Sequence, residues 1–88
     1  MSTKLSVDKK AKEVNALLII SPRCHEIREA RIKKGFSTRA LGDTAGLNPG
    51  TINRVENGKR SPSPKTANKI CVALGRELED LFVLMESE

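Results

Sequence analysis

Residues 36–60 read FSTRALGDTAGLNPGTINRVENGKR, and they are the most informative part of the chain for its fold. Two segments in it, 38–45 and 49–57, have apolar residues at helical spacing, and a short turn that contains Gly46 separates them. A serine or an asparagine, which can cap a helix N-terminus, precedes each segment. Pro49 suits the first position of the second segment because no hydrogen bond is lost there. The stretch therefore predicts a short helix, a tight turn and a second short helix.

The segment 49–57 has two different sides. Ile52 and Val55 can pack inward. The outward side carries Pro49, Gly50, Asn53, Arg54 and Asn57. A helix of this length spans about 12–14 Å, which is comparable to the width of a DNA major groove. Arg commonly binds guanine and Asn can pair with adenine, although an ordinary solvated helix face fits the polar residues alone equally well.

Proline and glycine divide the rest of the chain in the same way. Serine or asparagine precedes each of the four prolines, and four of the six glycines fall where a helix would end. The predicted helices are 22–34, 38–45, 49–57, 64–74 and 77–84, although Glu77 suits the start of the last one poorly. The predicted core consists of Ile27, Ala30, Leu41, Ala45, Ile52, Val55, Ala67, Ile70, Cys71, Leu74, Leu78, Leu81 and Phe82. The expected fold is an all-α, five-helix bundle.

The first twenty residues allow three structures. Val7, Ala11, Val14 and Leu18 share one face of a possible amphipathic helix. Residues 16–20 can instead form a short strand that pairs with 82–85, or the whole segment can be a loose basic arm. We therefore divide the chain into an N-terminal extension at 1–20, a domain at 21–84 and an acidic tail at 85–88.

Composition argues against several classes of function. Eighty-eight residues build one small core, and no constellation of catalytic side chains is present, so we expect no enzyme. Two Phe and no Trp or Tyr argue against base-stacking platforms. Cys24, Cys71 and His25 offer neither a disulfide framework nor a convincing metal site, so we expect no cofactor. Without a signal peptide or membrane span, the chain is expected to be soluble and cytoplasmic.

Charge is distributed unevenly along the chain, whose formal net charge is +5. Residues 21–60 carry nine Lys and Arg against four acidic residues, whereas residues 76–88 carry one Arg against five. A polarised basic surface favours a polyanionic partner over general solubility.

Residues 23–83 as a whole resemble the helix-turn-helix domain of the phage repressor/Cro family, also called XRE-type regulators. The matching segments are 27–31, 35–37, Leu41, Gly46-Leu47, 51–60, Pro62-Ser63, 73–75 and Leu81-Phe82, of which 52–60 is the most specific. The resemblance implies a five-helix domain, common in bacteria and phages, that binds double-stranded operator DNA as a dimer. The helix 49–57 then corresponds to the recognition helix.

The resemblance also assigns roles to individual residues. The family's base-reading positions correspond to Asn48, Pro49, Gly50, Asn53 and Arg54. Contacts to the DNA backbone correspond to Thr38, Thr51, Asn57, Lys59 and Arg60. Arg39 lies beside Thr38 at a helix start, where its positive charge is unfavourable unless an anion offsets it. The resemblance pairs Glu56 with Arg31, which ties the recognition helix to the first helix.

At two positions the chain departs from the family. Pro49 and Gly50 replace long polar residues that often contact bases there, so direct readout is expected mainly from Asn53 and Arg54. Gly50 and Gly42 are also expected to lower helix stability, by about 1 kcal/mol each relative to Ala.

The resulting prediction is a sequence-specific transcriptional regulator, in particular a repressor that binds a palindromic operator as a homodimer. The apolar run Leu81, Phe82, Val83, Leu84 and Met85 exceeds what one small core can bury, which favours a dimer contact, unless it closes the monomer against residues 14–20. Two alternatives remain, an antitoxin that binds a toxin protein and a restriction–modification controller protein.

Overall fold

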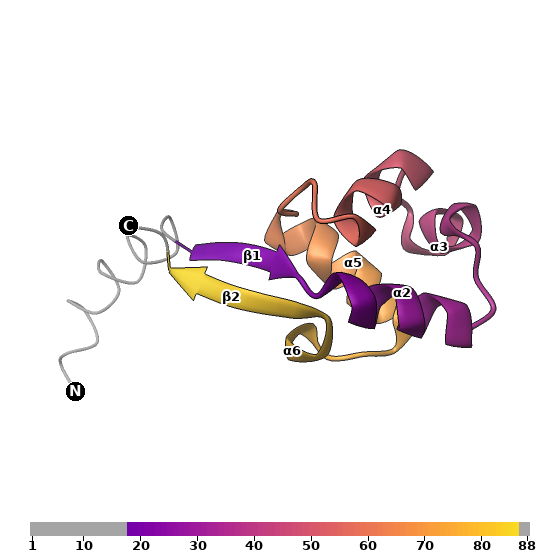
Figure 1. The fold of residues 1–88 in the computed structure, drawn as a ribbon. Coiled ribbons are helices and arrows are strands. Elements are labelled where there is room, and N and C mark those ends of the chain that lie inside the picture. Colours follow the sequence, from indigo (N-terminus) through magenta and orange to yellow (C-terminus); the bar gives the residue numbers. More distant parts are fainter. Residues whose placement is uncertain (1–17, 87–88) are drawn as a thin grey trace, which may run out of the picture.

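The computed structural model describes residues 18–86, which form five helices and a two-stranded sheet (Figure 1). The elements in chain order are β1 (Leu18–Pro22), α2 (Cys24–Lys33), α3 (Thr38–Ala45), α4 (Pro49–Glu56), α5 (Pro64–Leu74), α6 (Leu78–Leu81) and β2 (Phe82–Glu86). The predicted five-helix class is confirmed, and the sheet is an addition to it.

Local capping explains where the central helices begin and end. Ser37 Oγ accepts a hydrogen bond from the Ala40 amide (3.0 Å), and Ser63 Oγ accepts one from the Thr66 amide (3.2 Å). Gly75 ends α5 in the left-handed conformation, with φ of 66°, as the glycine pattern predicted. Helices α3 and α5 therefore have the predicted bounds, and α4 ends one residue early, at Glu56.

The strand β1 corrects the prediction for the first helix. Residues 21 and 22 were expected to start a helix, but they pair with Val83 and Phe82 in an antiparallel ladder that runs from Leu18 opposite Glu86 to Pro22 opposite Phe82. Pro22 lacks an amide donor, which an edge strand tolerates. Helix α2 therefore begins at Cys24, and no side chain caps it.

The strand alternative for the N-terminal segment is thus confirmed for the residues that the structure describes. Leu18, which was also placed on a possible amphipathic helix, lies in β1. Val7, Ala11 and Val14, the other members of that helix, lie outside the described residues.

The last predicted helix is too long. Helix α6 ends at Leu81, and residues 82–84, which were assigned to it, belong to β2. Glu77 is also more suitable for the helix start than predicted, because its amide donates to Asp80 Oδ2 (3.0 Å) and Asp80 thereby caps the turn.

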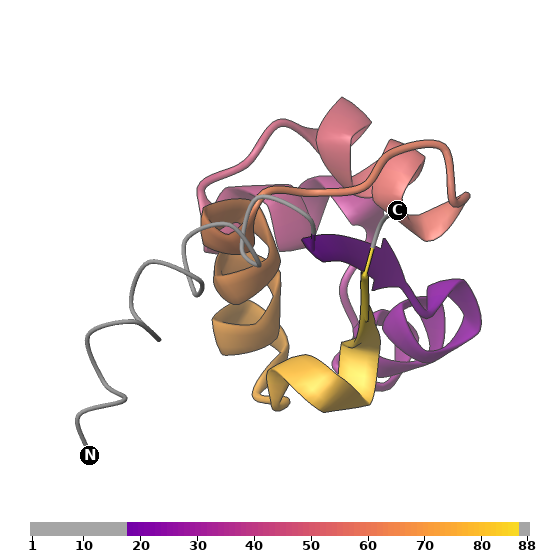
Figure 2. The same cartoon turned by 90° about the vertical axis from the view of Figure 1, so that its left-hand side faces the viewer.

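The core lies between the helices and the inner side of the sheet. Its members are Ile20, Ile27, Ala30, Leu41, Ile52, Val55, Ala67, Ile70, Cys71, Leu74, Leu81 and Phe82. Viewed along the strands, α2 and α5 lie on opposite sides of the molecule, with α4 at its periphery (Figure 2). Within residues 18–86, no helix has the length and apolar character that crossing a membrane requires.

Candidate nucleic-acid interface

A close backbone contact sets the angle between α3 and α4. The Leu47 amide donates to the Gly42 carbonyl (2.7 Å), and Gly46 between them has φ of 72°. A Cβ atom at position 42 would lie only 2.7 Å from the Leu47 carbonyl oxygen, which is closer than real Cβ contacts. Gly42 is therefore required by the turn itself, although the sequence indicated only a weakened helix.

Helix α4 separates buried from exposed residues along its length. Ile52 and Val55 are in the core, at 1% and 0% exposure. The exposed side carries Gly50, Asn53, Arg54 and Asn57. Figure 1 and Figure 2 both show α4 at the outside of the described fold. The exposed residues are thus accessible to a macromolecule that approaches α4.

A buried ion pair fixes α4 to α2. Glu56 is 3% exposed, and its two carboxylate oxygens accept hydrogen bonds from Nε and Nη2 of Arg31, the latter at 3.1 Å. The remaining nitrogen, Nη1, donates to the carbonyl of Phe36 (2.8 Å), just before α3 begins. One guanidinium therefore holds the recognition-helix candidate and the chain that enters α3 in a fixed relation.

A second arginine on α2, which the sequence reasoning missed, also reaches α4. Nε of Arg28 lies 3.6 Å from a Glu56 oxygen, and its Nη2 donates to Asn57 Oδ1 (3.2 Å). Asn57 Nδ2 in turn donates to Asn53 Oδ1 (2.7 Å). Arg28 precedes Arg31 by three residues and so shares its helix face, which is the sequence signal that could have identified it.

The other residues predicted to contact DNA lie at or near the surface. Exposed members are Arg39, Asn48, Gly50, Asn53, Arg54, Asn57, Lys59 and Arg60, and half-buried members are Thr38, Pro49 and Thr51. Asn48 has a local task as well, because its Oδ1 accepts from the Gly50 amide (2.7 Å) and caps α4.

The surroundings of these residues favour negative charge. Neither α3 nor α4 has an acidic residue in its first turn. The partial positive charge at the N-terminus of each helix is therefore not neutralised by a side chain of that turn. Arg39 is exposed in the first turn of α3, and Arg54 is exposed on α4. An anionic backbone is the complementary partner for such a surface.

The residues predicted for dimerisation divide into two groups. Leu81 and Phe82 are in the monomer core, at 0% and 1% exposure, so their side chains are not available to a partner. Val83 is half-buried, whereas Leu84 and Met85 are exposed at 47% and 48%. Ile19 on β1, which was not predicted for this role, is 39% exposed.

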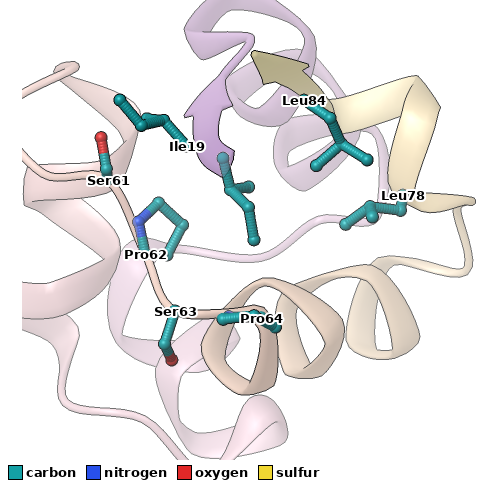
Figure 3. A pocket seen from close by; sticks show the side chains of 8 residues that line it. Ile19, Ser61, Pro62, Ser63, Pro64, Leu78 and Leu84 are labelled. Atoms are coloured by element: carbon teal, nitrogen blue, oxygen red, sulfur yellow. The ribbon is translucent and has the colours of Figure 1, made fainter. Parts of the chain in front are cut away.

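Beside this sheet lies an apolar pocket of about 640 Å³ (Figure 3). Its walls are Ile19, Ile20, Leu78, Leu84 and the segment 61–64. Figure 3 shows Leu84 and Leu78 on one side of it and Pro62 on the other.

The titratable residues form no metal centre within the described part of the chain. No group of three or more His, Cys, Asp or Glu side chains is close enough there to hold a metal ion. Cys71 is buried, and Cys24 Sγ donates to the carbonyl of Val55 (3.7 Å).

Comparison with known proteins agrees with this geometry. A helix-turn-helix family model matches residues 27–81. The HTH-type transcriptional regulator YgzD of Bacillus subtilis is 37% identical over 62 residues, which cover 70% of this chain and 94% of that protein.

Two solved structures share the fold. The restriction–modification controller protein C.AhdI of Aeromonas hydrophila is 32% identical, with a TM-score of 0.62 over 65% of this chain and 86% of its own. The DNA-binding domain of the P22 C2 repressor has a TM-score of 0.60 over 64% of this chain and 74% of its own, and at 23% identity it supports the fold alone. The chain therefore belongs to the phage repressor/Cro-type, or XRE, helix-turn-helix family of DNA-binding transcriptional regulators.

Proposed function

We propose that this protein is a repressor that binds a palindromic operator as a homodimer, with α4 in the major groove. The observation that carries the proposal is the exposed side of α4, where Asn53 and Arg54 stand on a helix that a buried ion pair fixes to the core. Rigid support of this kind matters because base recognition requires side chains held in defined positions.

Affinity in this proposal comes mainly from contacts to phosphates. Thr38 and Arg39 at the start of α3, and Lys59 and Arg60 after α4, are the candidates on either side of the recognition helix. Each phosphate that a Lys or Arg neutralises releases a counterion, so binding is expected to weaken as salt rises.

Base selection comes from fewer residues. Pro49 offers no donor and Gly50 no side chain, and the Asn48 oxygen already caps the helix. Asn53 and Arg54, one turn further along α4, are left as the main direct readers. Deformability of the operator would contribute the rest of the selectivity.

Dimerisation is the contribution proposed for the sheet. Ile19 and Leu84, which line the pocket of Figure 3, and Met85, which is opposite Ile19 in the sheet, leave apolar surface exposed. The sheet has two strands, so within the described residues each strand has one edge without a partner strand. Apolar surface next to unpaired strand edges is a usual basis for self-association.

A second candidate function is control of a restriction–modification system. The similarity to C.AhdI, of which 86% is covered at 32% identity, is the observation that favours it. The two functions make different predictions, because a repressor lowers transcription from its target, whereas a controller would act on the promoter of a linked methylase or nuclease gene.

Selection from a random duplex pool tests the proposal. The full chain is incubated with the pool at about 150 mM salt, where nonspecific binding is weak, and the retained duplexes are sequenced. We expect inverted half-sites whose centres are about one helical turn apart. A reporter that carries the selected site within its promoter then gives the sign of regulation, and repression is expected.

Two results would contradict the proposal. Retention without any common motif would leave a nonspecific basic domain. A motif that is not repeated in inverted orientation would retain sequence-specific binding but exclude a symmetric dimer on the operator.

A further inference from the structure

A chain of hydrogen bonds leads from α2 to the exposed side of α4. Arg28 Nη2 donates to Asn57 Oδ1 (3.2 Å), and Asn57 Nδ2 donates to Asn53 Oδ1 (2.7 Å). The arginine is itself held, because its Nε lies 3.6 Å from the buried carboxylate of Glu56. The three linked side chains of Arg28, Asn57 and Asn53 are called the relay below.

The direction of the relay is determined by its first member. A guanidinium group has only donors, whereas an amide side chain has an acceptor at one side and a donor at the other. Asn57 must therefore turn its oxygen to Arg28 and its nitrogen to Asn53. Asn53 must in turn receive that donor with its oxygen, which leaves its own Nδ2 group as the free end.

Reversing either amide would bring two donors together. If Asn57 were turned over, its Nδ2 group would face the guanidinium of Arg28 at hydrogen-bond distance, and a favourable contact would become a repulsive one. Because all three side chains are exposed, water can pair with the displaced donors, so the reversal costs about the net value of one hydrogen bond, ~1 kcal/mol, plus the repulsion between the two donors. The polarity set on α2 is thus transmitted over two side chains to α4.

We propose that Arg28 and Asn57 are positioning residues that determine which base Asn53 accepts, by holding its amide donor toward the DNA. This inference rests on the proposed function, in which Asn53 is a base reader. With Nδ2 as its free end, Asn53 selects a base that presents an acceptor at the centre of its major-groove edge. At that position guanine presents O6 and thymine presents O4, whereas adenine and cytosine present amino donors; the acceptor of adenine, N7, lies away from that centre.

The isosteric substitution Asn57→Asp reverses the relay. A carboxylate still accepts from Arg28 but has no donor for Asn53, so the Asn53 amide must turn over and present Oδ1 outward. At the one base contacted by Asn53, the preference should change from guanine or thymine to adenine or cytosine. We expect a change of about five- to tenfold in relative affinity, which corresponds to one hydrogen bond made or lost.

The measurement compares binding to the selected operator and to its single-base variants, for the full chain in four forms. These forms are the unchanged protein, Asn57→Asp, Asn53→Ala, and both substitutions together. The new carboxylate repels phosphates on every duplex, and this general loss cancels in the ratio between two duplexes. In the Asn53→Ala background, Asn57→Asp should no longer alter any base preference.

Two substitutions of Arg28 provide the matched control. Lysine is also a donor without acceptors, so Arg28→Lys should retain the base preference. Arg28→Met should remove the preference at this base and leave the others unchanged. If Arg28→Met instead weakens binding to all duplexes equally, Arg28 is a phosphate contact and the proposal is wrong.

The failure of this inference is distinguishable from that of the proposed function. If the unchanged protein selects a motif but Asn57→Asp leaves every base preference as it was, the relay is refuted and the operator-binding function stands. If the unchanged protein has no base preference at all, both are refuted.

Discussion

At the scale of single residues, the carboxylate of Glu56 joins the stability of the fold to the position of α4. It is 3% exposed and accepts two hydrogen bonds from Arg31, and Arg28 lies nearby. A buried carboxylate that loses its partner is strongly unfavourable, whereas a buried pair as a whole contributes little net stability. The value of the pair is therefore in fixing the helix rather than in raising the melting temperature.

Removing one partner of this pair should destabilise the protein. We expect Arg31→Ala to lower the free energy of unfolding by about 3–5 kcal/mol, because the buried Glu56 would lose both of its hydrogen-bond donors and retain only the more exposed Arg28 at 3.6 Å. Urea denaturation measures the loss. The matched control is Glu29→Ala, which breaks an exposed pair with Lys33 (3.8 Å) and should cost at most about 0.5 kcal/mol. Equal losses in the two variants would contradict the role given to Arg31.

Cys71 should make the stability of the protein depend on alkaline pH. Burial, and to a lesser degree the carboxylates of Asp80, Glu77 and Glu79, raise the pKa of its thiol above the ordinary value. Above the ordinary pKa the unfolded chain releases this proton and the native protein does not, so stability falls as pH rises. Below that pKa both states hold the proton and no penalty exists.

Urea denaturation between neutral and alkaline pH, under reducing conditions, tests this. The free energy of unfolding should decline with pH, and it should decline less in Cys71→Ala. The same slope in both proteins would show that the thiol is not responsible.

At the scale of elements, the sequence predicted helices well where local capping determines them. Ser37, Ser63, Pro64 and Gly75 act within one helical turn, so their effect is visible in the sequence, and α3 and α5 have the predicted bounds. The strands depend on a partner about sixty residues away. The run from Leu81 to Met85 fits a helix or a strand equally well until that partner is known. For this reason the predicted last helix was too long.

In the candidate site, too, the features that depend on local sequence were predicted and those that depend on packing between elements were not. Helix α4 was located from the residues between Asn48 and Arg60, since its cap and its two sides are local features. The contact from Arg28 to Asn57 joins α2 and α4 and is created by packing, so the spacing that places Arg28 on the same helix face as Arg31 does not identify Asn57 as its partner. The close approach of Gly42 to Leu47 is also a contact that the sequence did not predict.

Gly42 provides the test at this scale. By helix propensity alone, Gly42→Ala should stabilise α3 by about 1 kcal/mol. Because the new Cβ would meet the Leu47 carbonyl at 2.7 Å, we expect a loss of about 1–3 kcal/mol instead. Thermal unfolding shows whether the Gly42→Ala variant is more or less stable than the unchanged protein. Thr44→Ala, at an exposed position in the same helix, is the control and should be neutral or slightly stabilising. A stabilised Gly42→Ala variant would contradict the turn geometry.

At the scale of the whole molecule, charge and apolar surface serve different partners. The basic residues around α3 and α4 are assigned to DNA, and the exposed apolar residues of the sheet are assigned to a second copy of the chain. Figure 1 shows the strands extending away from α3, so the start of α3 and the far end of the sheet lie on different parts of the molecule. DNA binding and self-association can then occur together.

The dimer is tested by placing a charge at Leu84, an exposed residue of β2 (47%). We expect sedimentation of the unchanged protein at micromolar concentration to give a dimer, and Leu84→Lys to give a monomer with the same helical circular-dichroism signal. Val72→Lys is the control, because Val72 is an exposed apolar residue (72%) on α5 rather than on the sheet. A monomeric unchanged protein, or a Leu84→Lys variant that remains dimeric, would contradict the assigned interface.

One affinity ratio shows whether α4 reads base sequence through Asn53 and Arg54. The dissociation constant is measured at about 150 mM salt for the selected duplex and for a scrambled duplex of the same composition. We predict a ratio of about a thousandfold or more for the unchanged protein, and a large decrease in the Asn53→Ala, Arg54→Ala double variant. A ratio near one, or a ratio that the double variant leaves unchanged, would contradict the claim.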